Sequence, residues 1–148
     1  MLADILEHLL GRAITADDTV QLPEEKKLGD LRRDYVAGGD TLDRAAVGFT
    51  EGGGAALFRI GAALDGSEIN RMTAKAMAVI YDDEKDHYMV QAREALSLIG
   101  NEGDLRRMQE AIRAVSRQRV RMRNEMFGAL MTDDEIEAFI AEHTKAAT

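Results

Sequence analysis

The chain of 148 residues contains no cysteine, and this absence removes several kinds of chemistry at once. Without a thiol there are no disulfides, no thiolate catalysis and no zinc–thiolate sites. Proline is nearly absent too, with one in the whole chain, and long segments have helical periodicity. Because proline interrupts helices, its scarcity together with that periodicity predicts an all-α protein.

Long apolar segments are also missing. No run of 18 apolar residues exists, and the N-terminus lacks the basic and then apolar pattern of a secretion signal. The sequence therefore predicts neither membrane insertion nor secretion, and a cytoplasmic location is the default. A net charge of −8 argues against nucleic acid as a general partner. The length and the 45% hydrophobic content predict a single domain, 1–148, with an adequate core.

Three long helices are predicted in the middle of the chain. Asp40 caps the first, 41–64, whose apolar residues cover nearly its whole circumference and therefore predict a buried helix. A glycine turn ends it, so that it forms a tight antiparallel hairpin with the next helix, and this hairpin covers 41–99. Asn101 caps the third long helix, 102–131.

Shorter helices flank this central part. Residues 1–13 form a short amphipathic helix, and 14–40 form a long crossover in which Pro23 starts a further short helix. The segment 132–148 begins with a capping box and supplies a final helix and tail. The core helices of the domain are therefore expected within 41–131.

Glu84 and His87 lie in the apolar stripe of the second hairpin helix, at positions where leucine is expected. Their spacing puts both side chains on one helix face, one turn apart. Burying a carboxylate and an imidazole without partners costs several kcal/mol, and a metal ion is the most economical compensation. The pair is a weak signal by itself, because this spacing arises easily by chance, so the inference depends on its position.

A second carboxylate, Glu51, lies in the first hairpin helix and is followed by three glycines, each costing about 1 kcal/mol relative to alanine. Two explanations of this run stay open: close helix packing or a kink, and space for a ligand beside a metal-binding carboxylate. Counted from the hairpin turn, Glu51 and Glu84 lie about 22 and 27 Å away, within roughly one helical turn of the same level.

A buried Glu51 level with Glu84-x-x-His87 resembles half of the metal site in the ferritin-like di-iron carboxylate superfamily. That superfamily uses a four-helix bundle with one Glu plus one Glu-x-x-His, twice. The resemblance covers 41–99 and implies a ferritin-like helical bundle with a two-iron site, or manganese in its place, held by these three residues. The alternative is a satisfied polar cluster that binds no metal.

The second half of such a site is missing from the sequence. Of the other histidines, His8 and His143, neither follows a Glu by three residues. Because long crossovers in this superfamily join its second and third helices, the chain resembles the C-terminal half of the fold. An N-terminal half, a partner subunit or a second copy across a twofold axis would supply the other ligands, and these three stay open. A homo-oligomer or a partner subunit is therefore expected.

Two more side chains are candidates for the chemistry. Arg119 falls on the apolar stripe of the third helix near the level of Glu84, where it would pair with a site carboxylate or hold an anionic group of a substrate. Tyr81, one turn before Glu84, would hydrogen-bond a ligand or relay electrons. Surface salt bridges and ordinary packing are the alternative roles of these two residues.

Three functions follow from these observations. The first is a non-haem di-iron oxidase or oxygenase that activates O₂ on a small-molecule substrate. The second is a ferroxidase or an iron-storage subunit. The third, from a different class, is a metal-free helical interaction module whose polar core fixes the register of its partner.

Overall fold

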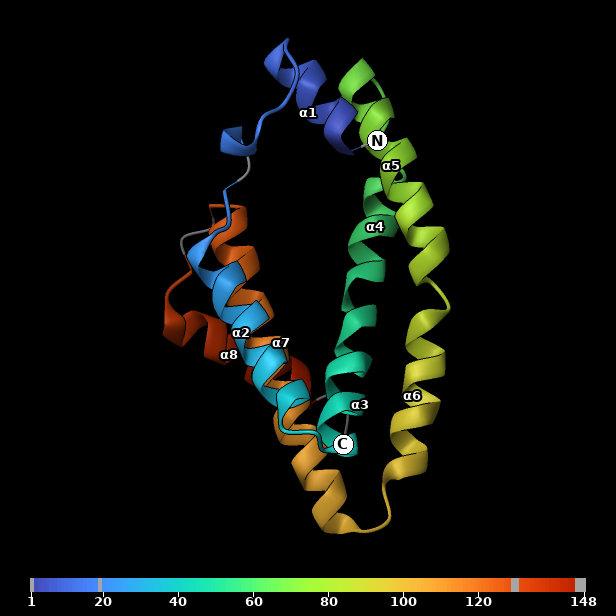
Figure 1. The fold of residues 1–148 in the computed structure, drawn as a ribbon, viewed down its shortest axis with the longest axis vertical. Helices are drawn as coiled ribbons and strands as arrows, with labels where there is room; N and C mark the ends of the chain where they lie inside the picture. Colours follow the sequence, from blue (N-terminus) through green and yellow to red (C-terminus); the bar gives the residue numbers. More distant parts are fainter. Residues whose placement is uncertain (1, 19, 129–130, 146–148) are drawn as a thin grey trace. The chain divides into compact units, whose positions relative to one another are not determined.

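The computed structural model describes residues 2–18, 20–128 and 131–145, and every regular element within these ranges is a helix (Figure 1). The all-α prediction is therefore confirmed. Within these ranges no helix is both long enough and apolar enough to cross a membrane. The chain divides into two compact units, Met1–Val20 with Glu51–Glu94, and Gln21–Thr50 with Ala95–Thr148. The prediction of a single domain, 1–148, stays a prediction.

The first unit is assembled from short helices, which in chain order are α1 (Leu2–Leu10), η1 (Ala16–Asp18), η2 (Thr50–Gly54), α4 (Ala55–Gly61), α5 (Glu68–Glu84) and the start of α6 (His87–Leu98). Helices α4 and α5 lie side by side, and α1 packs against α5 (Figure 1). A Cβ atom on Gly61 would lie 2.7 Å from Cγ of Met77, so glycine is what lets α4 approach α5 there.

The core of this unit is small. Among its described residues, Ala76 is the only buried hydrophobic side chain. Large apolar side chains on α4 stay exposed instead, with 37% of Leu57 and 64% of Ile60 accessible to solvent. The prediction that 41–64 forms a buried helix is therefore wrong for α4, because apolar residues around a helix are buried only where other elements cover every side.

The second unit holds most of the buried residues of the chain. Its helices are α2 (Pro23–Ala37), α3 (Thr41–Phe49), α7 (Glu102–Met126) and α8 (Asp133–Lys145), together with the end of α6. Helix α7 packs against α2, α3 and α8 (Figure 1). One core cluster joins α3, α6 and α7 through Ala46, Ala95, Met108 and Ala111, and another joins α2, α3 and α7 through Leu28, Val47 and Val115.

The predicted helix starts are confirmed by their caps. Asp40 Oδ1 accepts a hydrogen bond from the backbone N–H of Leu42 at 2.8 Å, and Asn101 Oδ1 accepts one from Gly103 at the start of α7. At the start of α8, Thr132 and Glu135 form the expected reciprocal capping box. These contacts join residues two or three positions apart, which is why the sequence alone predicts them.

The predicted hairpin helices are interrupted, and this corrects their boundaries. The first, 41–64, is divided into α3, the 3-10 helix η2 and α4, because the Gly-rich segment after Thr50 has little helix propensity. The second is broken between Glu84 and His87. The third helix, predicted as 102–131, ends at Met126 instead. Gly128, with a φ of +60°, follows two residues later.

The core of the second unit allows a direct test of its packing. Met108 on α7 is 3% exposed, and Leu105, one turn earlier on the same helix, is 39% exposed. We expect Met108→Ala to lower the free energy of unfolding by about 2–5 kcal/mol, because it leaves a cavity among alanines that cannot move in to fill it. The matched change Leu105→Ala should cost much less. Urea unfolding followed by circular dichroism measures both, and equal losses would contradict the described core.

Candidate metal half-site

Glu84 and His87 face each other across the break between α5 and α6. Glu84 is the last residue of α5, Lys85 and Asp86 form a turn, and His87 is the first residue of α6. Oε2 of Glu84 lies 3.6 Å from Nδ1 of His87. The predicted proximity of the two side chains is therefore present, although the helix that was expected to produce it is interrupted.

The side chains of this pair are open to solvent. Exposure is 29% for the Glu84 side chain and 51% for the His87 side chain. The expectation that both are buried where leucine belongs is therefore wrong. Water already solvates part of each group, so the cost of burial does not by itself require a metal ion. What the geometry provides is an accessible carboxylate beside an accessible imidazole.

Glu51 lies beside a later part of α6 than the count of residues from the hairpin turn predicted. Its Oε2 accepts a hydrogen bond from Nε2 of Gln91 at 3.4 Å, and Gln91 follows His87 by four residues. The arithmetic assumed an α-helix that continues to residue 64, whereas α4 ends at Gly61 and the residues before α5 are not helical, so the path from the turn to Glu51 is longer than assumed. The 3-10 helix η2, which rises about 2.0 Å per residue, lengthens that path further. In the part of the chain that the structure describes, no three or more His, Asp or Glu side chains gather closely enough to hold a metal ion.

Gln91 belongs to the candidate site and was not among the predicted residues. Its side-chain oxygen Oε1 is buried and has no hydrogen-bond partner, while its nitrogen donates to Glu51. Residues 84, 87 and 91 follow the i, i+3, i+7 spacing of a single helix face, although the break interrupts the helix. The signal that points to Gln91 in the sequence is a polar residue at a position of the apolar stripe.

Of the three glycines after Glu51, the structure describes the surroundings of Gly54. A Cβ atom on Gly54 would lie 2.7 Å from Cε2 of Phe58, four residues later, so a larger residue there would require that ring to move. Both explanations of the glycine run therefore stay open. The surroundings of Gly52 and Gly53 lie outside the described residues.

The two predicted catalytic side chains have separate positions. Arg119 on α7 donates a hydrogen bond from Nη1 to the backbone oxygen of Thr50, the residue that ends α3. This bond satisfies a carbonyl group at a helix end, which is a structural role. Tyr81 is partly exposed, one turn before Glu84, and its backbone oxygen accepts a hydrogen bond from Lys85. Catalytic roles for both stay predictions.

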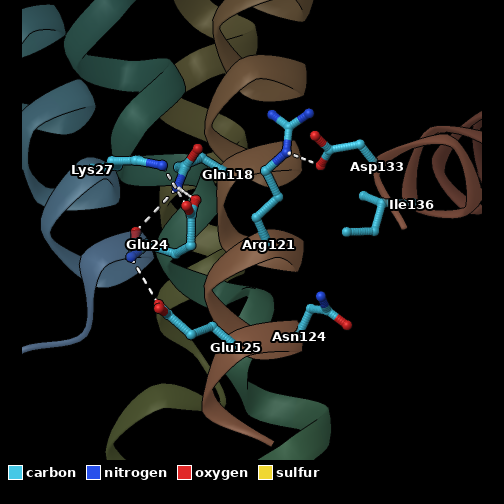
Figure 2. Close-up of a pocket in the computed structure, with 8 residues that line it drawn as sticks. All are labelled: Glu24, Lys27, Gln118, Arg121, Asn124, Glu125, Asp133 and Ile136. Carbon is cyan, nitrogen blue, oxygen red and sulfur yellow. Dashed lines mark hydrogen bonds and ion pairs between the residues drawn. The ribbon is translucent and has the colours of Figure 1, made fainter. Parts of the chain in front are cut away.

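The second unit also contains a polar pocket of about 420 Å³ between α2, α7 and α8 (Figure 2). The carboxylate of Glu125 accepts a hydrogen bond from the backbone N–H of Glu24 at 2.8 Å, and Gln118 donates to the Glu24 carboxylate, also at 2.8 Å. Contacts with Lys27 and Gln118 hold the pKa of Glu24 below its usual range. Arg121 pairs with Asp133 on α8. Because these polar groups form hydrogen bonds and ion pairs with one another, the contacts around the pocket join the three helices.

Comparisons with protein-family models, with curated proteins and with solved structures found no match to this chain. The resemblance to the ferritin-like superfamily therefore rests on Glu51, Glu84 and His87 alone. Any assignment of function depends on the chemistry of the side chains around these residues.

Proposed function

We propose that this chain binds iron or manganese at a half-site formed by Glu51, Glu84, His87 and Gln91, and that a second copy of the chain completes the site. The observation that carries the proposal is the 3.6 Å contact between the Glu84 carboxylate and the His87 imidazole on an accessible surface. Carboxylate and amide oxygens with one imidazole are donors that suit these two metals better than copper or a structural zinc.

The donor set fits such an ion only in part within one chain. Glu84 and His87 are adjacent, and the unpartnered oxygen of Gln91 lies beside Glu51 about one turn further along α6. Two adjacent ligands leave several coordination positions of iron or manganese without a protein donor. A twofold axis near the pair would double every donor, which is how a symmetric dimer turns half of a site into a whole one.

The helices that carry the pair also expose apolar side chains. Val79 on α5 is 55% exposed, and Met89 and Val90 on α6 are 44% and 62% exposed. Together with the small core of this unit, these side chains favour a partner that packs helices against α5 and α6. Pairing two such hairpins would give the ferritin-like four-helix bundle that the sequence resembles.

Bound iron would supply the reduction of O₂, the chemistry that the oxidase and ferroxidase predictions share. The protein's part is to supply Glu84 and His87 as ligands and, through the second copy, to cover them from water. We therefore propose that the protein oxidises Fe(II). As an extension of this activity, the oxidised site would act on a small molecule as an oxidase or oxygenase. Tyr81, which belongs to the same unit as Glu84 and His87, is the side chain to test for that extension.

A metal-free helical interaction module is the second candidate, and the apolar exposure of α4 favours it. Leu57 is 37% exposed and Ile60 is 64% exposed, and these side chains would favour association whether or not an ion is bound. This candidate predicts self-association that does not depend on metal.

Sedimentation velocity under anaerobic conditions, with and without added Mn(II) or Fe(II), tests both candidates. We expect added metal to shift the 16.3 kDa chain to twice its mass, with at least one ion bound per two chains. A dimer of the same strength that binds no metal would favour the interaction module instead. A monomer that binds no metal would contradict both.

A further inference from the structure

Helix α8 is attached to the second unit in a different way from α2 and α3. A cluster of buried apolar side chains, Leu28, Val47 and Val115, joins α2 and α3 to α7. Among the described side chains of α8, by contrast, only Ile136 is buried, and 45% of Phe139 is exposed. A single buried side chain contributes less to packing than a cluster shared by three helices.

Three ion pairs join α8 to α7. Oε1 of Glu137 lies 2.7 Å from Nε of Arg117 and 3.4 Å from Nη2 of Arg121. Oδ1 of Asp133 lies 3.1 Å from Nε of Arg121, a contact that Figure 2 shows. The two acids are four residues apart on α8 and the two arginines are four residues apart on α7, so each set lies on one helix face. Two negative charges on α8 therefore meet two positive charges on α7.

These ion pairs are of a kind that water and salt weaken. The side chain of Asp133 is 76% exposed and that of Glu137 is 39% exposed, so solvent and ions compete for both carboxylates. Nε of Arg117 is buried and lies close to Glu137, but its N–H is not aligned for a hydrogen bond. This pair therefore lacks the strength that a charge-assisted hydrogen bond would add.

We infer that α8 is a detachable strap, which separates from α7 while the core of α2, α3 and α7 stays folded, and that its ion pairs with Arg117 and Arg121 control this separation. A helix of 13 residues is marginal by itself in water, so α8 unfolds when it separates. Because Asp133 and Ile136 line the polar pocket of Figure 2, separation opens one side of that pocket. The strap belongs to the second unit and does not depend on the proposed metal half-site.

Hydrogen exchange of the full chain, followed by mass spectrometry of its peptides, tests this inference. We expect the backbone amides of α8 to exchange at least about tenfold faster than those of α7 around Val115, a residue with no exposed surface, because the strap opens without the core. Raising NaCl from about 0.1 M to about 1 M should increase this ratio, because the Debye length falls from about 10 Å to about 3 Å.

Two matched variants of α8 test the charges. Glu137→Gln removes the carboxylate that faces both arginines and should speed the exchange of α8 about fivefold, while exchange around Val115 stays unchanged. Glu142→Gln makes the same change at an exposed position of the same helix and should alter neither rate. Glutamine and glutamate have nearly equal helix propensities, so a difference between the variants reports the ion pairs.

A double variant separates the ion pair from other effects of the substitutions. Adding Arg117→Gln to Glu137→Gln should speed the exchange of α8 little further, because the carboxylate that faces Arg117 is already gone. Circular dichroism checks that each variant keeps the helical content of the parent. Equal exchange rates for α8 and for α7 around Val115 in the parent protein would overturn the inference. Equal acceleration in Glu137→Gln and Glu142→Gln would also overturn it.

Discussion

Replacement of both Glu84 and His87 by alanine is expected to remove metal binding from the protein. The two side chains lie 3.6 Å apart and are the only pair of adjacent ligands that the proposal assigns to one ion. Loss of a single hydrogen-bond partner behind a ligand already lowers metal affinity 10–100-fold, so loss of two direct ligands should lower it by more than about 100-fold. Metal content after dialysis against Mn(II) or anaerobic Fe(II), measured by mass spectrometry, gives the result.

The control for this variant also removes one acidic residue and one histidine, but at other exposed positions. Asp83→Ala with His8→Ala removes one carboxylate and one imidazole from exposed sites outside the proposed ligand set and should leave metal content unchanged. Gln91→Leu should give a smaller loss than the double variant, because it removes one neutral donor. Full metal content in the Glu84→Ala, His87→Ala protein would contradict the metal-binding proposal.

The second large effect concerns assembly. We expect Val79→Glu with Val90→Glu to convert a dimer into a single chain, because each change places a carboxylate on the apolar surface that flanks the ligand pair. Two such charges on each chain meet their symmetry copies across a twofold axis and must lose water on contact, at a cost of several kcal/mol. With Mn(II) added, light scattering should give a mass of 16.3 kDa for this variant and twice that value for the parent protein.

Val20 supplies the matched control for assembly. It is 76% exposed, in the connection before α2, so Val20→Glu should leave the mass of the assembly unchanged. The Val79→Glu, Val90→Glu protein should also lose bound metal, although its own ligands are intact, because the second copy no longer completes the site. A parent protein that binds metal as a single chain would show that the second copy is not required.

The sequence by itself determined the helical class and where most helices begin. Asp40, Asn101 and Thr132 cap the helices that follow them, as expected from their positions. A cap is a contact between a side chain and a backbone group two or three residues away, so it depends on little else in the molecule. The proximity of Glu84 and His87 has the same local origin, since their spacing brings them together even across a turn.

The tertiary structure decided which side chains are buried and which residues of neighbouring helices lie beside one another. Both depend on what each helix packs against. The apolar pattern of 41–64 predicts a buried helix, but Ile60 is 64% exposed, and the side chains of Glu84 and His87 are partly exposed as well. Glu51 lies beside Gln91 because α4 ends at Gly61 and the 3-10 helix η2 precedes it, and both lengthen the path from the hairpin turn to Glu51. Periodicity reports which face of a helix is apolar, and only the surrounding chain determines whether that face meets protein or water.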